Sequence, residues 1–190
     1  MIPKASEFGG RLPSGESPMK KAAVIALAVV AGVASWFGMQ WLLTTIDNAP
    51  SAKHGYRYVA DDYSVRFPGE PHLTVEKVPG TELTVEFMQW GNRQKQYAAT
   101  WQPARQAGAT LESVTESAVL GGGGTAIESE DYDVEGGRGM LTQVDSDGEN
   151  LWLLVAFPDD GDGVAILTYL GDEQDSAFFE SLSIGDAATS

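Results

Sequence analysis

The sequence predicts an α+β protein: a transmembrane helix, then an antiparallel sheet covered by helices, in the order four strands, helix, four strands, helix. Three observations lead to this prediction. An uncharged apolar run fills residues 22–46. Beyond it, short segments of alternating apolar and polar residues lie between Gly- and Pro-rich turns, a pattern typical of half-buried strands. In two places the alternation gives way to the three-to-four-residue spacing of an amphipathic helix.

The apolar run 22–46 predicts a transmembrane helix or signal-anchor. Its 25 residues, at about 1.5 Å of rise each, exceed the ~30 Å hydrocarbon core of a bilayer. The residues before the run carry a net charge of +2 and those after it −17, and positive residues beside a span stay in the cytoplasm. We therefore expect a single-pass inner (cytoplasmic) membrane protein, with residues 1–21 as a disordered cytoplasmic tail and the domain outside.

A cleaved secretory signal is the alternative interpretation of this run. A chain starting at Met19 would begin with two lysines and an apolar segment, and residues 32–34 offer a small-residue cleavage site. The apolar run continues for a dozen residues past Ala34, which is longer than a signal peptide needs. An uncleaved anchor is therefore favoured, and both interpretations place the domain outside the cytoplasm.

The remainder of the chain predicts one domain. Residues 47–55, with Pro50 and Ser51, have the composition of a short linker. Residues 56–184 form the predicted extracytoplasmic α+β domain, and residues 185–190 a disordered tail. The first half of the domain alternates as a meander of antiparallel strands. Its four predicted strands are residues 63–67, 73–78, 83–90 and 96–101.

The period then changes to that of a helix. Thr110 is a suitable N-cap, and the spacing of Leu111, Val114 and Val119 predicts a short amphipathic helix that ends at the glycines 121–124. No lysine follows these glycines, so they do not form a phosphate-binding loop. Four more strands and a closing helix are predicted at residues 126–134, 139–144, 151–157, 164–170 and 174–182.

Residues 63–71 read Tyr-Ser-Val-Arg-Phe-Pro-Gly-Glu-Pro. This motif resembles the opening of a group of secreted or membrane-anchored bacterial domains whose first strand ends in Phe-Pro-Gly-x-Pro. Three later features fit the same group: Tyr97, the turn Gly136-x-x-Gly139, and residues 177–182. The resemblance spans the predicted domain and implies a PsbP-like fold, an α/β/α sandwich. It carries no catalytic residues, and a fold alone does not determine function.

The chain has no cysteine and two histidines, His54 and His72. Disulfides, thiol chemistry and cysteine-ligated zinc are therefore excluded, and two scattered imidazoles make a poor metal site or general base. The Gly-x-Ser-x-Gly motif of hydrolases is also missing from the sequence. We predict a protein that is not an enzyme, with no catalytic, cofactor-binding or metal-ligating residue assigned and no cofactor.

Negative charge is concentrated in the second half of the domain. Residues 47–105 are neutral overall, whereas residues 106–190 set Arg138 against 18 acidic residues. Such a field repels nucleic acid and anionic lipid headgroups, so nucleic acid is not an expected partner. The acids form either a solvated face or a docking surface for a basic partner. Asp131, Asp133 and Glu135 are predicted members of that surface.

These observations predict a membrane-tethered accessory or interaction domain that binds an unidentified protein of the cell envelope. The alternative function is that of a small-ligand or calcium-binding domain. Trp90 and Trp101 could line a ligand groove. Two acidic turns could supply oxygen ligands, although neither has the spacing of an EF-hand loop. These turns hold Asp145, Asp147 and Glu149, and Asp159, Asp160 and Asp162.

Overall fold

A computed structural model describes residues 55–77, 84–92, 95–105 and 107–185 of the chain. The predicted cytoplasmic tail, the apolar run 22–46, nearly all of the linker and the last five residues lie outside these ranges. Among the described residues, no helix has the length and apolar character that crossing a membrane requires.

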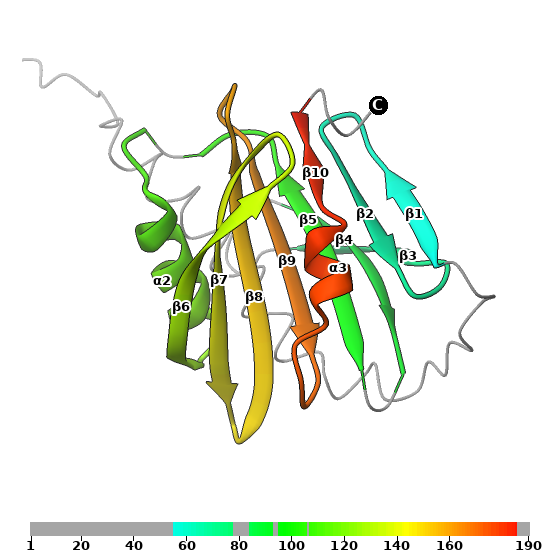
Figure 1. Cartoon of the computed structure of the whole chain (residues 1–190), viewed down its shortest axis with the longest axis vertical. Coiled ribbons are helices and arrows are strands. Elements are labelled where there is room, and N and C mark those ends of the chain that lie inside the picture. The colour runs from blue at the N-terminus through cyan, green and yellow to red at the C-terminus, as the bar shows by residue number, and fades with distance from the viewer. Residues whose placement is uncertain (1–54, 78–83, 93–94, 106, 186–190) are drawn as a thin grey trace, which may run out of the picture.

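The described part of the chain is mainly β-sheet, with ten strands and two helices (Figure 1). Seven strands form an antiparallel sheet in the order β3-β4-β5-β9-β8-β7-β6, and three form a smaller sheet in the order β1-β2-β10. The elements are β1 (Tyr56–Val59), β2 (Tyr63–Phe67), β3 (His72–Lys77), β4 (Thr84–Gly91), β5 (Gln96–Gln102), α2 (Leu111–Gly121), β6 (Thr125–Val134), β7 (Gly137–Ser146), β8 (Glu149–Pro158), β9 (Val164–Leu170), α3 (Ser176–Glu180) and β10 (Ser183–Ile184).

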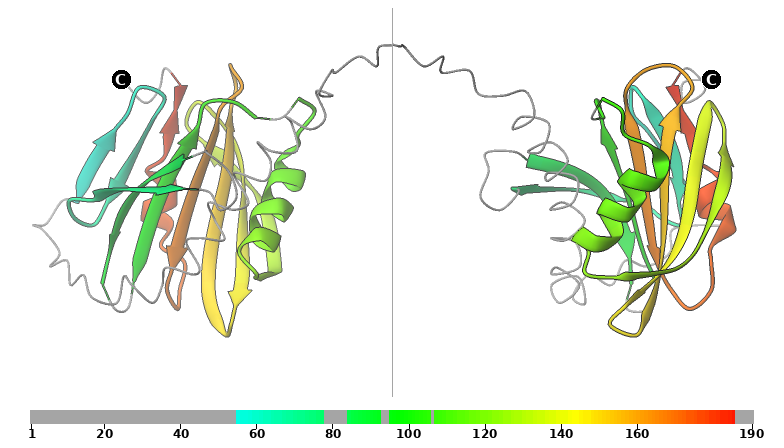
Figure 2. Two further views of the ribbon diagram at one scale, coloured as in Figure 1. Left: turned by 180° about the vertical axis from the view of Figure 1, so that it is seen from behind. Right: turned by 90° about the vertical axis from the view of Figure 1, so that its left-hand side faces the viewer.

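The predicted helix-covered sheet, an α/β/α sandwich, is wrong. The two helices have eleven and five residues, and they lie on opposite sides of the seven-stranded sheet (Figure 2). The element order also differs, because β1 precedes the four strands expected first and β10 follows α3. Both additional strands pair with β2. These two strands and β2 form the smaller sheet. Together with α3, this sheet covers one face of the large sheet, where a layer of helices was expected.

Two apolar clusters fill the space on either side of the large sheet. The first lies between the two sheets and includes α3. Its fully buried members include Val65, Phe67, Leu154, Leu167 and Phe179. The second lies beneath α2, which contacts β6, β7 and β8. Because successive side chains of a strand point to opposite faces, β7 and β8 contribute to both clusters.

Helix α2 begins and ends where the sequence predicts. The side chain of Thr110 accepts a hydrogen bond from the Ser113 backbone N–H at 3.2 Å, and Ser113 Oγ accepts one from the Thr110 N–H at 3.0 Å. This reciprocal capping box satisfies two N–H groups at the helix start. At the other end Gly123 adopts a φ of 71°, which turns the chain sharply into β6.

Candidate functional site

Strand β6 forms one edge of the seven-stranded sheet. It pairs with β7 on one side and with no described strand on the other. Eight of its ten residues are exposed, Tyr132 is partly buried and Val134 is buried. The strand carries four exposed carboxylates: Glu128, Glu130, Asp131 and Asp133. An edge strand of this kind presents unpaired backbone N–H and C=O groups to the surroundings.

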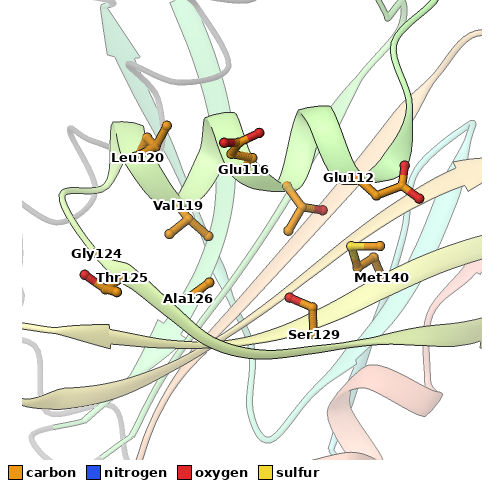
Figure 3. Close-up of a pocket in the computed structure, with 10 residues that line it drawn as sticks. Glu112, Glu116, Val119, Leu120, Gly124, Thr125, Ala126, Ser129 and Met140 are labelled. Carbon is orange, nitrogen blue, oxygen red and sulfur yellow. The ribbon is translucent and has the colours of Figure 1, made fainter.

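A groove separates β6 from α2, with a volume of about 450 Å³. Figure 3 shows Val119 and Leu120 on the helix, Ala126 and Ser129 on the strand, and Met140 near Ser129, between the helix and the strand. The cross-strand register places Ser129 opposite Thr142 and Asp131 opposite Met140, so these side chains share the face that α2 covers. The ten lining residues are Glu112, Thr115, Glu116, Val119, Leu120, Gly124, Thr125, Ala126, Ser129 and Met140.

The Thr115 hydroxyl lies in this groove without a partner. The residue is 4% exposed, and its Oγ1 makes no hydrogen bond in the described part of the chain. Leaving a buried hydroxyl unsatisfied costs about 1–3 kcal/mol. The wall of the groove therefore contains an unsatisfied hydroxyl that is itself shielded from solvent.

Carboxylates lie on the helix side of the groove as well as along β6. Glu112 and Glu116 are exposed, one turn apart on α2. The pKa of Glu112 lies below its ordinary value, chiefly because the Thr110 side chain hydrogen bonds to the ionised form. Glu112 is thus firmly ionised at neutral pH. Together with Glu128, Glu130, Asp131 and Asp133 these two residues form what we call the acidic edge.

Two large apolar side chains are exposed beside the groove. Leu120 at the end of α2 is 69% exposed, and Ile127 on β6 is 57% exposed. Ile127 lies where the pairing register of β6 and β7 shifts between Ala126 and Glu128. Such a bulge leaves the extra residue unpaired in the ladder. The acidic edge therefore has an apolar end near the α2–β6 turn.

The structure brings together two of the three predicted surface acids. Asp131 and Asp133 both lie on the groove face of β6. Glu135 lies beyond the strand and has another role: its carboxylate accepts a hydrogen bond from Ser183 Oγ at 2.6 Å, and its C=O accepts one from the Ile184 N–H at 2.9 Å. Glu135 therefore connects the two sheets.

The acidic turns proposed for calcium do not assemble a site. They follow successive strands of an antiparallel sheet and so lie at opposite ends of it (Figure 1). Asp145 accepts a hydrogen bond from the Gly148 N–H at 2.9 Å, and Asp147 and Gly148 have φ values of 54° and 85°, as in a type I′ hairpin turn. Among the described residues, no three acidic or histidine side chains are placed to hold a metal ion.

A second cavity of about 370 Å³ lies at the other end of the β8 strand from that turn. Four of its lining residues are aspartates, Asp61, Asp62, Asp159 and Asp160, but they do not form a metal-binding group. The acids at this end of the sheet remain a solvated cluster.

The two tryptophans considered for a ligand groove pack in the core instead. The Trp90 ring centroid lies 5.5 Å from that of Tyr97. Trp101 is half-buried and stacks on Tyr63 with a centroid distance of 6.1 Å and an interplanar angle of 14°. Neither residue lines either cavity described above.

Sequence reasoning did not identify Thr115, Glu116, Leu120 and Met140 as members of one site. Of these four residues, only Leu120 could have been identified from the sequence, because it is an apolar residue outside the buried stripe of α2. The other three depend on the angle between α2 and β6, which local sequence patterns do not specify.

A scan against protein-family models finds no match for this chain, and a search of curated proteins finds none either. The resemblance of residues 63–71 to the Phe-Pro-Gly-x-Pro group therefore stays a prediction.

Proposed function

We propose that this protein is a non-enzymatic interaction domain that binds a basic protein partner through the acidic edge. The observation that carries the proposal is an apolar groove with Glu112 and Glu116 on its helix side, next to an edge strand that carries four more exposed carboxylates. Arg138, the single basic residue between positions 106 and 190, lies opposite Asp133 in the pairing register and offsets part of this charge, which leaves an excess of carboxylates at the acidic edge. An excess of like charge raises the rate and specificity of binding to a surface of opposite sign.

The proposal includes a membrane tether formed by residues 22–46. The apolar run is long enough to span a bilayer, and the charge asymmetry around it favours a cytoplasmic N-terminus. The domain would then lie outside the cytoplasm beside other envelope proteins. A tethered domain meets its partner in the plane of the membrane, which raises the effective concentration of both.

Crosslinking in native membranes, followed by affinity purification of the tagged full-length chain, tests this function. Identical samples are washed at increasing NaCl concentration before mass spectrometry. We expect a near-stoichiometric envelope protein whose retention falls as salt rises, because screening weakens attraction between exposed charges. Recovery of this chain alone, or retention that does not depend on salt, would contradict the proposal.

A further inference from the structure

We propose that the acidic edge binds an extended segment of its partner as an additional strand beside β6. The segment would carry lysine or arginine alternating with apolar residues. This inference rests on the proposed function and specifies the form in which the partner is recognised.

The open edge of the large sheet is a suitable place for an added strand. Strand β6 ends the order of the seven-stranded sheet, is ten residues long, and has no described strand on its outer side. An extended peptide that adds to such an edge gains main-chain hydrogen bonds along its length, while pockets for alternate side chains provide specificity.

A groove lies beside this edge under α2 (Figure 3). Its volume of about 450 Å³ falls within the ~300–1,000 Å³ range of ligand-binding pockets. Val119, Leu120 and Met140 provide apolar contacts for a bound side chain. Every second side chain of an added strand would point into this space.

The charge pattern of β6 also fits such a segment. The register places Glu128 and Glu130 on the face away from α2, and Asp131 and Asp133 on the groove face. Basic side chains of an added strand would meet the two glutamates on the face away from α2. Its apolar side chains would lie on the groove face at the end of β6 near Leu120, where Ala126 and Ser129 line the groove and the two aspartates do not. Beside this end of β6, the partner segment would alternate basic and apolar residues.

The same charges oppose pairing with a second copy of the chain. Two β6 edges brought together would place carboxylates against carboxylates, and like charges directly opposite each other destabilise strand pairs. Acidic side chains on an edge strand are also a known means of preventing self-association. A basic segment of another protein is therefore the occupant that the edge selects.

The test uses a fluorescent ten-residue peptide of alternating lysine and valine and the full-length chain in a zwitterionic detergent. We expect saturable binding that weakens with salt and slows hydrogen exchange at the amides of β6. The control peptide has the same side chains but methylated backbone nitrogens, so it keeps the charge and loses the N–H donors. It should bind at least about tenfold more weakly.

A matched pair of variants tests the place of binding. Leu120→Arg adds a positive charge at the groove, and Leu73→Arg adds one on β3, the opposite edge of the sheet; the two leucines are 69% and 55% exposed. Both exposed positions should tolerate arginine. We expect Leu120→Arg to weaken peptide binding at least about tenfold and Leu73→Arg to leave it near that of the unmodified chain.

Three results would overturn the inference: equal binding of the methylated peptide, equal effects of the two variants, or protection at β1 or β3 instead of β6. Protection of β6 that rises with protein concentration without peptide would identify a second copy as the occupant, and would also overturn it. If these controls fail while the full-length chain still captures a partner in a salt-dependent way, the proposed function stands and only strand addition is wrong.

Discussion

At the scale of single residues, Tyr97 connects the large sheet to α3. Its ring packs against Tyr169 at a centroid distance of 4.8 Å and against Phe178 at 5.0 Å. Its hydroxyl donates a hydrogen bond to Asp175 Oδ2 at 2.6 Å, while Asp175 Oδ1 accepts one from the Phe178 N–H at the start of α3. The Asp175 carboxylate thus accepts hydrogen bonds from both β5 and α3.

The change Tyr97→Phe should lower the free energy of unfolding by about 1.5–3 kcal/mol, the range for a hydrogen bond to a charged group. Phenylalanine keeps the ring packing, so the decrease in the free energy of unfolding measures the contribution of the hydroxyl. Chemical denaturation of the full-length chain measures it, with Tyr56→Phe as the control because Tyr56 is 41% exposed at the edge of the small sheet. Equal stability of the two variants would show that the hydrogen bond contributes nothing.

Burial of tyrosines also predicts how stability depends on pH. Burial is the main cause that raises the pKa of Tyr63 and Tyr97 above the ordinary value of 10.0, and the hydrogen bond to Asp175 raises that of Tyr97 further. A group whose pKa is raised in the folded state stabilises that state fully below its unfolded pKa. Stability should therefore decline as pH rises above about 10, the unfolded value for tyrosine. Urea denaturation between pH 8 and 11 should show a shallower decline for Tyr97→Phe, and an identical decline would contradict this account.

The three acids predicted for the surface show which features of the site could be predicted from the sequence. Asp131 and Asp133 were identified because an unusual density of acids is visible in the sequence. Glu135 lies in the same acidic stretch of the sequence, yet its carboxylate accepts a hydrogen bond from Ser183, which is 48 residues away. A hydrogen bond between distant segments leaves no local trace, so its role could not be foreseen.

At the scale of elements, α2 forms because local signals agree. The capping box at Thr110, the apolar stripe and the terminal glycines all indicate the same helix. The small sheet is the opposite case. Strand β10 has two residues, Ser183 and Ile184, and exists because it pairs with β2 more than a hundred residues earlier. No periodicity can be measured over two residues, which is why the layer that replaces the expected helices was missed.

Removing the cap should therefore weaken α2 and the wall of the groove that it forms. The change Thr110→Ala is expected to lower the free energy of unfolding by about 1 kcal/mol, whereas Thr110→Asp, which also caps well, should retain most of it. Thermal denaturation of both variants measures the difference. If alanine and aspartate behave alike, the hydroxyl hydrogen bond to Ser113 has no part in the stability of the helix.

At the scale of the whole molecule, charge is the dominant property. The net charge of −15 arises almost entirely after residue 105, and self-repulsion of this kind destabilises a compact state. Raising NaCl from about 10 mM to about 150 mM shortens the Debye length from ~30 Å to ~8 Å and should raise the melting temperature. The double variant Asp131→Asn/Asp133→Asn should gain less from salt. A melting temperature that is constant or falls with salt would show that repulsion among the acids is unimportant.

Partner capture by two variants of equal charge tests whether the acidic edge is the binding site. One variant neutralises the strand part of the acidic edge, with Glu128→Gln, Glu130→Gln, Asp131→Asn and Asp133→Asn. The other neutralises four exposed acids elsewhere, with Asp147→Asn, Glu149→Gln, Asp172→Asn and Glu173→Gln. Crosslinked partner is quantified by mass spectrometry for both, in the same membranes. We expect at least about a tenfold loss of captured partner for the first variant and near-normal capture for the second. Equal capture by the two would show that the acidic edge is a solvated surface and not a binding site.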